Sequence, residues 1–244
     1  MVFNIRQARA FSLAEFSVVL VVISLVIGAV MVGAQIIRGA EIKTMVATVD
    51  DMKTAISQFE LLYGKLPGDI DTATSIWSAA TNGDGDGSID GETAGEAFAV
   101  FDHLQRAGLL NGTLSGTWSN GFSIGGNVMK LTPKQAGLYA RCCSTTDYSR
   151  TLSFNNHIMV FSVYSADDDY RAGAITPKEG YNIDQKYDDA IPDTGFIGGS
   201  GSYNGSAYVA TGCYNGTGSS SAYESDNATY QDGMNCQMLF GYDW

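Results

Sequence analysis

The residues best suited to do chemistry lie in a short acidic run, TNGDGDGSIDGE, in the first half of the chain. Oxygen-bearing side chains occupy alternate positions there, and a glycine follows the third of them. Such a pattern lets a tight loop wrap one hard cation such as Ca²⁺. The candidate ligands are Asn82, Asp84, Asp86, Ser88, Asp90, Glu92 and Glu96.

This run departs from a complete EF-hand loop, which ends in a bidentate glutamate at its twelfth position. Thr93 occupies that position, so Glu92 or Glu96 would have to supply the missing ligand in a different loop geometry. The alternative is a solvated acidic turn without an ion, although close carboxylates without a counter-ion repel one another. We expect a structural Ca²⁺ in a loop at 82–96, because the run offers neither a nucleophile nor a base.

Other residues offer little for catalysis. The two histidines, His103 and His157, are far apart in the sequence, and no Ser/His/Asp, Cys/His or metal-hydrolase motif occurs. The formal net charge of −12 disfavours a phosphate-backbone partner, because such binding depends on cationic side chains. The sequence therefore predicts neither an enzyme nor a nucleic-acid-binding protein.

The four cysteines, Cys142, Cys143, Cys213 and Cys236, have no CxxC spacing, so a zinc site is not expected. Disulfides are expected instead if the C-terminal part lies in an oxidising compartment. Four cysteines allow three pairings, and the adjacent Cys142 and Cys143 rarely bond to each other because backbone geometry resists so small a ring.

Residues 16–37 form an almost unbroken apolar run, whose polar members are Ser17, Ser24 and Gln35. A helix of this length spans roughly 33 Å, close to the hydrocarbon core of a bilayer. A buried helix of a soluble protein would normally be shorter and would show a polar stripe. We therefore expect 16–37 to cross a membrane.

Glu15 stands at the edge of this apolar run, with no basic residue within one helical turn after it. A carboxylate in that position is costly unless a cationic group meets it. If the chain were cut after Ala10, the new α-amino group of Phe11 would lie one helical turn from Glu15. In a staggered bundle, the amine of one copy could then reach the carboxylate of its neighbour and set the register between them.

The short basic leader, the sequence FSLAEF and the long apolar helix together resemble the processing signal of type IV pilins and of type II secretion pseudopilins. This resemblance implies that a prepilin peptidase cuts between Ala10 and Phe11 and methylates the new amine. It also implies that Glu15 guides assembly. The chain departs from the family in having Ala10 in place of glycine and Ala14 in place of a large aliphatic residue.

Later motifs resemble pilin-like proteins as well, namely YGKLPGD, NGDGDG, HLQRAGLL, YNIDQKYDDAIPDTGFI and CQMLFGYDW. In these proteins the last motif closes a long loop through a disulfide, which implies a bond between Cys213 and Cys236. Closing a loop of that size stabilises the fold by roughly 3 kcal/mol. Four acids in the fourth motif could form a second cation site or, equally, a solvated turn: Asp184, Asp188, Asp189 and Asp193.

The resemblance implies an α+β, type IV pilin-like fold, with a long N-terminal helix packed on a mostly antiparallel sheet. The corresponding boundaries are a leader at 1–10, a helix at 11–63, and a globular domain at 64–244 that contains a cysteine-closed loop at 213–236. Apolar residues recur at three- and four-residue steps between Ile42 and Tyr63, which independently predicts that the apolar helix continues with one buried face.

Two kinds of local signal mark elements of the second half. HIMVFSVY at 157–164 predicts a central strand because of its apolar density. Two Thr-Pro pairs, at Thr132 and Thr176, are each followed by a glutamine or glutamate and predict the starts of two helices.

From these features we expect a structural subunit of a type IV pilus-like or pseudopilus filament. It would be a single-pass inner-membrane protein before assembly, and then part of a periplasmic or extracellular filament made of copies of itself or of other pilins. One alternative is a membrane-tethered adhesive or binding module that keeps residues 1–10 and stays monomeric. Another is a soluble exported calcium-binding protein that begins near Gln35, although its signal peptide would have an unusually long apolar region.

Overall fold

The computed structural model divides the chain into an N-terminal unit, Met1–Thr44, and a C-terminal unit, Met45–Trp244. Several residues of the sequence predictions lie outside the described part of the chain, namely the leader at 1–10, Phe11, Glu92, Cys142 and Cys143. The structure describes residues 12–90, 95–117, 121–131, 136–141, 156–163, 171–203, 208–209, 212–226 and 233–242.

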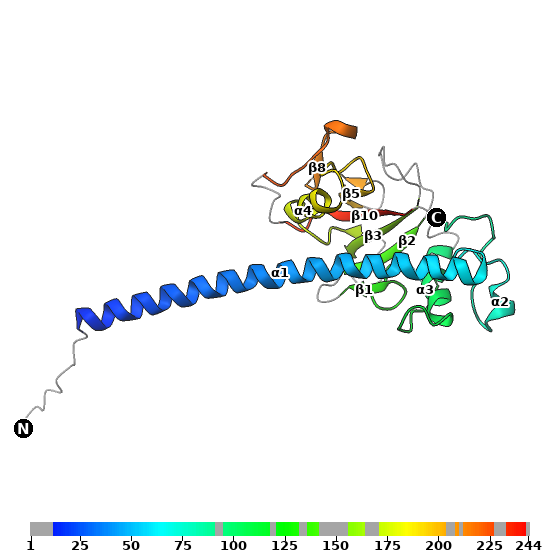
Figure 1. Cartoon of the computed structure of the whole chain (residues 1–244), viewed down its shortest axis with the longest axis horizontal. Helices are drawn as coiled ribbons and strands as arrows, with labels where there is room; N and C mark the ends of the chain where they lie inside the picture. Colours follow the sequence, from blue (N-terminus) through cyan, green and yellow to red (C-terminus); the bar gives the residue numbers. More distant parts are fainter. Residues whose placement is uncertain are drawn as a thin grey trace, which may run out of the picture. The chain divides into compact units, whose positions relative to one another are not determined.

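Helix α1, Leu13–Tyr63, begins in the N-terminal unit (dark blue in Figure 1). Its large apolar side chains between Leu13 and Ile37 are exposed; Leu25, for example, is 68% exposed. Among the described residues, α1 is the one helix long and apolar enough to cross a membrane. The helix predicted at 11–63 is confirmed over the part of it that the structure describes.

Within the C-terminal unit, α1 has the amphipathic character that the sequence predicts. One stripe of this part is buried, and it consists of Met45, Val46, Val49, Met52, Ala55, Ile56 and Phe59. The helix ends where Gly64 adopts a φ of 68°, a conformation that favours glycine, while its N–H still bonds to the Glu60 carbonyl at 2.7 Å.

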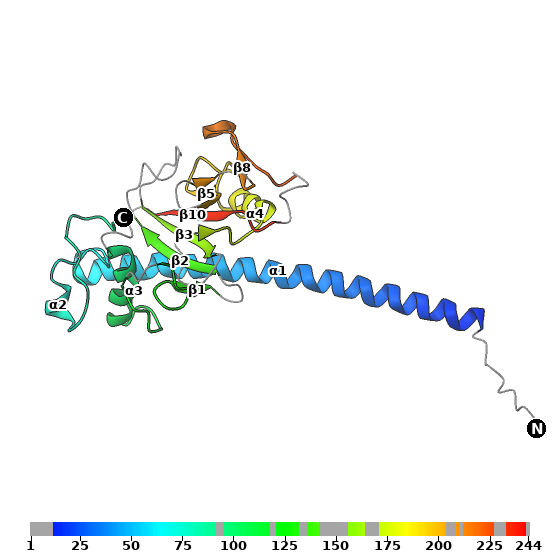
Figure 2. The same ribbon diagram turned by 180° about the vertical axis from the view of Figure 1, so that it is seen from behind.

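The C-terminal unit is built on an antiparallel sheet with the order β1-β2-β3-β10-β5, and β4 pairs with β3 (Figures 1 and 2). The central strand predicted at 157–164 is confirmed as β3. The bounds are Met129–Leu131 for β1, Ala136–Arg141 for β2, Asn156–Val163 for β3, Arg171–Ala172 for β4, Ile197–Ser200 for β5 and Gln237–Tyr242 for β10.

Short elements surround the sheet. The helices are α2 (Ala73–Ile76), α3 (Glu96–Arg106), α4 (Pro177–Tyr187) and the 3-10 turn η1 (Gly218–Ser220). Two small hairpins pair β6 (Ser202–Tyr203) with β7 (Tyr208–Val209), and β8 (Tyr214–Asn215) with β9 (Ala222–Tyr223). The long helix and the antiparallel sheet together make the chain an α+β protein.

The two Thr-Pro pairs have different outcomes. Thr176 is the N-cap of α4, and its hydroxyl and the Glu179 carboxylate form a complete capping box, so this prediction is confirmed. The other predicted helix start, at Thr132, lies outside the described residues, and no helix extends past it because the chain forms strand β2 from Ala136.

Aromatic rings hold α3 against the sheet. Phe98 of α3 lies 5.6 Å from Tyr139 of β2 and 5.7 Å from Phe122, measured between ring centroids. Phe122 in turn meets Phe161 of β3 edge-on at 4.9 Å. All four rings are fully buried, so this packing fixes the position of α3 on the sheet.

A disulfide joins Cys213 to Cys236, with their Cα atoms 4.8 Å apart, which confirms the pairing that the family resemblance implies. Both half-cystines are fully buried, and Cys236 directly precedes β10. The bond therefore ties the loop that contains β8 and β9 to an interior strand of the sheet.

Replacing both residues, Cys213→Ser with Cys236→Ser, is expected to destabilise the C-terminal unit by about 3 kcal/mol, because the unfolded chain regains loop entropy. The thermal midpoint in near-ultraviolet circular dichroism should fall by roughly 6–12 °C. Reduction of the wild-type protein should cause a similar fall. Midpoints that stay unchanged after either treatment would contradict a stabilising role for this bond.

Candidate functional site

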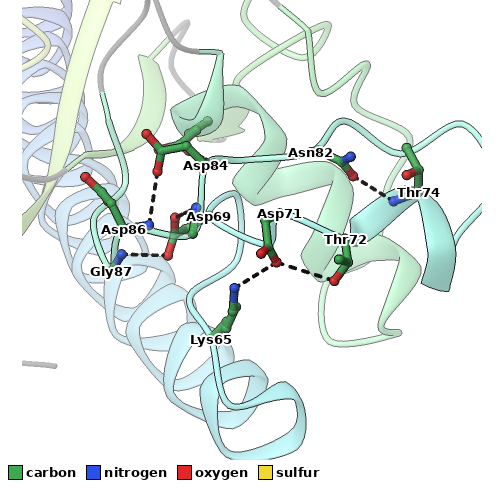
Figure 3. A network of polar contacts seen from close by, with 11 residues as sticks. Lys65, Asp69, Asp71, Thr72, Thr74, Asn82, Asp84, Asp86 and Gly87 are labelled. Atoms are coloured by element: carbon green, nitrogen blue, oxygen red, sulfur yellow. Dashed lines mark hydrogen bonds and ion pairs between the residues drawn. The ribbon is translucent and has the colours of Figure 1, made fainter.

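The acidic loop is held by the turn that follows α1. Both carboxylate oxygens of Asp69 accept hydrogen bonds from the loop backbone, from Gly85 N–H at 2.7 Å and from Gly87 N–H at 3.0 Å (Figure 3 shows the bond to Gly87). Asp69 is only 1% exposed. Its neighbour Gly68 has a φ of 94°, and a Cβ there would lie 2.5 Å from the Glu96 carbonyl oxygen, so the turn packs closely on the start of α3.

Glu96, the first residue of α3, holds the loop from the other side. Its two carboxylate oxygens accept hydrogen bonds from Asp84 N–H and Asp90 N–H, both at 2.8 Å. Glu96 is also only 1% exposed. A carboxylate at the N-terminus of a helix is further stabilised by the helix dipole.

These contacts bring carboxylates together in two overlapping groups. Asp69, Asp84 and Glu96 form one, and Asp84, Asp86 and Asp90 form the other; within each group, one oxygen per residue lies within 4.8 Å of the others. Burial raises the pKa of the Asp69 and Glu96 carboxyl groups above their ordinary values, against the lowering effect of their backbone hydrogen bonds. Ionising both groups side by side is therefore unfavourable without a counter-ion.

The structure gives the side chain of one predicted ligand, Asn82, a different partner. The amide oxygen of Asn82 accepts a hydrogen bond from Thr74 N–H at 2.9 Å, and Figure 3 shows it directed toward Thr74 and away from Asp84 and Asp86. Ser88 donates its backbone N–H to the Asp86 carboxylate at 2.8 Å. Asp69 is the residue that the sequence prediction of ligands omitted, although it ends the LPGD motif.

His103 fixes the two sides of the loop to α3. Its Nδ1 accepts a hydrogen bond from Gly68 N–H at 2.8 Å, so Nε2 carries the proton and donates it to the Thr81 carbonyl at 2.8 Å. Burial lowers the pKa of this imidazole, which keeps it neutral. With both nitrogens occupied, His103 positions the loop and is not available as a metal ligand.

The donor chemistry of the loop fits a hard cation. The two acidic groups consist of carboxylates, and oxygen ligands of this kind suit Ca²⁺ or Mg²⁺ rather than zinc or copper. Each carboxylate oxygen has two lone pairs, so Asp69 and Glu96 can bind an ion and keep their backbone hydrogen bonds.

A second acidic group lies at the end of α4 and consists of Asp184, Asp188 and Asp189. Asp184 is fully buried and accepts hydrogen bonds from Ala190 N–H at 3.0 Å and from the Tyr223 hydroxyl at 2.9 Å. Burial raises the pKa of this carboxyl to about 7.

The neighbouring acids of this motif also bind backbone groups of its turns. Asp188 accepts from Ile197 N–H at 2.7 Å, Asp189 from Ile191 N–H at 2.8 Å, and Asp193 from Gly218 N–H at 2.5 Å. These contacts give the second acidic motif a turn-stabilising role.

Glu15 has a local partner at the start of α1. Its carboxylate accepts a hydrogen bond from Ser12 N–H at 2.8 Å, and its own N–H donates to the Ser12 hydroxyl at 3.2 Å. This reciprocal pair is a capping box. The Ser-x-x-Glu spacing in the sequence is its signal, and the sequence interpretation of Glu15 did not include it.

Comparison of the chain with protein-family models, with curated proteins and with solved structures finds no match.

Proposed function

We propose that this chain is a structural subunit of a type IV pilus-like or pseudopilus filament, with a type IV pilin-like fold. The observation that carries the proposal is the apolar surface of α1 between Leu13 and Ile37, whose large side chains are about half exposed or more. Exposed apolar area on this scale needs lipid or other protein to cover it. A bilayer covers it before assembly, and the helices of neighbouring copies cover it in the filament.

The same helix then changes character. From Met45 onward its apolar stripe is buried within a compact α+β unit, so one element serves first as an anchor and then as part of a globular core. Copies related by a repeated, non-closing contact would form an open helical polymer. In this proposal the inner membrane, a prepilin peptidase and other copies of the chain or related pilins are the partners, and the filament is periplasmic or extracellular.

Intact-mass measurement of the protein purified from its native host tests this proposal directly. The expected mass corresponds to a chain that begins at Phe11 and carries one added methyl group on its α-amine. A chain that keeps residues 1–10 would indicate a membrane-tethered monomeric module, and a chain that begins near Gln35 would indicate a soluble exported protein. Either of these two masses contradicts the filament proposal.

We further propose that the acidic loop binds Ca²⁺ in a structural role. The ligands would be Asp69, Asp84 and Glu96, with Asp86 and Asp90 beside them. Two of these carboxylates are buried and have raised pKa values, so an ion that binds their charged forms offsets the cost of burying them. The ion would join the turn after α1 to the start of α3.

Calcium is expected to raise the thermal midpoint of the full chain in detergent. At a free Ca²⁺ concentration of a hundred times the Kd, linkage gives about 2.7 kcal/mol, or a rise of roughly 5–10 °C. Asp69→Asn should remove most of this rise, whereas Asn82→Ala should retain it. If Asn82→Ala abolishes the rise and Asp69→Asn does not, the ligands follow the alternate-position pattern of the sequence instead. If Ca²⁺ causes no rise, the loop is a solvated acidic turn.

A further inference from the structure

A hollow of about 360 Å³ lies between α4 and the segment that includes β9. α4 contributes Lys178, Tyr181 and Asn182 to its lining, and the segment after β9 contributes Ser225 and Asp226. Figures 1 and 2 show α4 (yellow) beside the β8 region (orange) from both sides. The volume is at the small end of the range of known ligand sites.

Buried contacts fix the two walls of this hollow. The Tyr223 hydroxyl donates to the buried Asp184 carboxylate at 2.9 Å, which ties β9 to α4. The Tyr223 ring also meets the Tyr181 ring edge-on, with centroids 6.4 Å apart. Glu224 N–H donates to the Cys213 carbonyl at 2.9 Å, so the disulfide anchors the β9 wall. The hollow is therefore preorganised, which lowers the entropic cost of binding.

Four polar side chains that line the hollow, here called its rim, have hydrogen-bonding groups that the described part of the chain does not use. Within the described part of the chain, Lys178, Asn182, Ser225 and Asp226 have no side-chain hydrogen bond or ion pair. Lys178, Asn182 and Asp226 are exposed. With Ser225, these residues offer an ammonium donor, an amide that donates and accepts, a hydroxyl, and a carboxylate acceptor.

The chemistry of this lining selects a class of ligand. One cation and one anion make the rim neutral overall, and the formal net charge of −12 on the chain disfavours an anionic ligand. Closely spaced donors and acceptors suit a molecule whose hydroxyl groups each donate and accept. A tyrosine ring beside them suits a ligand that also has an apolar face.

We propose that the hollow between α4 and β9 is a binding site for a neutral saccharide of one or two sugar rings. Asn182 and Asp226 bind sugar hydroxyls, Lys178 donates to a further oxygen, and the Tyr181 ring contacts the C–H face of a sugar. This site is separate from the acidic loop and does not depend on filament formation.

Saturation-transfer NMR on the full chain tests the proposal. The protein is kept in lauryldimethylamine oxide, because detergents with sugar headgroups would compete for the site. The probes are glucose, galactose, mannose, N-acetylglucosamine and the β-1,4-linked dimers of glucose and N-acetylglucosamine. Glycine betaine and glutamate serve as charged comparison probes.

At least one saccharide is expected to give a saturation-transfer signal with the wild-type protein. Asn182→Ala and Asp226→Ala should each raise the Kd of that saccharide, measured by titration, about tenfold, because each removes one or two hydrogen bonds. Neither change removes a side-chain hydrogen bond or ion pair among the described residues, so both variants should unfold at the wild-type temperature. The matched control Asn111→Ala, an exposed asparagine outside the hollow, should bind as wild type does. The proposal is overturned if no saccharide binds, if the two variants bind as the control does, or if only the charged probes bind.

Discussion

Glu15→Gln is expected to reduce filament assembly on the order of a hundredfold while the protein still accumulates in the membrane. In the proposed filament, Glu15 pairs with the α-amino group of Phe11 of a neighbouring copy. Removing one partner of a desolvated ion pair leaves the other charge uncompensated, at a cost of about 3–5 kcal/mol. The apolar surface of α1 is unchanged, so insertion should persist. Glutamine can still accept the Ser12 N–H, so the variant retains a capping partner and isolates the effect of charge. The measurement is the ratio of sheared filament to membrane-bound subunit on immunoblots, with electron microscopy of the sheared fraction.

The matched control is Ser12→Ala, which removes the hydroxyl of the capping box and leaves the carboxylate charged. Loss of a cap costs about 1 kcal/mol of helix stability, so assembly should change little in this variant. The mature N-terminus of each variant is checked by mass, which separates a processing defect from an assembly defect. If Ser12→Ala fails as severely as Glu15→Gln, or if Glu15→Gln assembles normally, the role of Glu15 is helix capping rather than assembly.

Glu96→Ala is expected to destabilise the C-terminal unit by about 4 kcal/mol when Ca²⁺ is removed by a chelator. The change leaves the backbone N–H groups of Asp84 and Asp90 without their acceptor in a partly buried loop, at about 1–3 kcal/mol each. The thermal midpoint, followed by near-ultraviolet circular dichroism, should fall by roughly 8–16 °C.

Two further variants define what the Glu96 experiment measures. Glu96→Gln keeps one acceptor oxygen and should lie between the wild type and Glu96→Ala. Asp51→Ala, which removes an exposed acid on α1, should change stability by no more than about 0.5 kcal/mol. A midpoint for Glu96→Ala close to that of Asp51→Ala would show that the two loop hydrogen bonds contribute little.

Patterns that repeat along the chain were sufficient to predict the largest elements. The periodic apolar residues between Ile42 and Tyr63 identify the buried face of α1, because packing on a core repeats with the helical period. The apolar run at 157–164 identifies β3, because consecutive residues of this strand, from Ile158 to Phe161, are all buried and both of its faces are therefore covered. Both patterns arise because buried positions require apolar residues, and the positions of apolar residues can be seen in a single sequence.

The geometry of the acidic loop could not be read from spacing alone. The alternate positions of Asn82, Asp84 and Asp86 indicate a loop, but they do not show which backbone N–H groups compete for each side chain. Asn82 is directed to Thr74, and Asp69 approaches the loop from a separate turn. Such contacts depend on how the turn after α1 packs on α3, which is a tertiary property.

The two Thr-Pro pairs show the same limit for local signals. Each satisfies the requirements of a helix start; Thr176 begins a helix, whereas the described residues that follow Thr132, from Ala136 on, lie in strand β2. The residues of β2, from Ala136, pair with β1 and β3, where the gain from sheet packing exceeds the contribution of a cap of about 1 kcal/mol. A cap marks where a helix can start, and tertiary packing determines whether it forms.

The place of β10 in the sheet has a consequence for biosynthesis. β10 is the strand of this sheet that the ribosome makes last, yet it lies between β3 and β5 and hydrogen-bonds to both. Until it emerges, β3 and β5 each present an open backbone edge that can pair with other chains. The nascent protein therefore exposes an unpaired strand edge from the synthesis of β3 until that of β10, and misassembly through this edge is favoured during that interval.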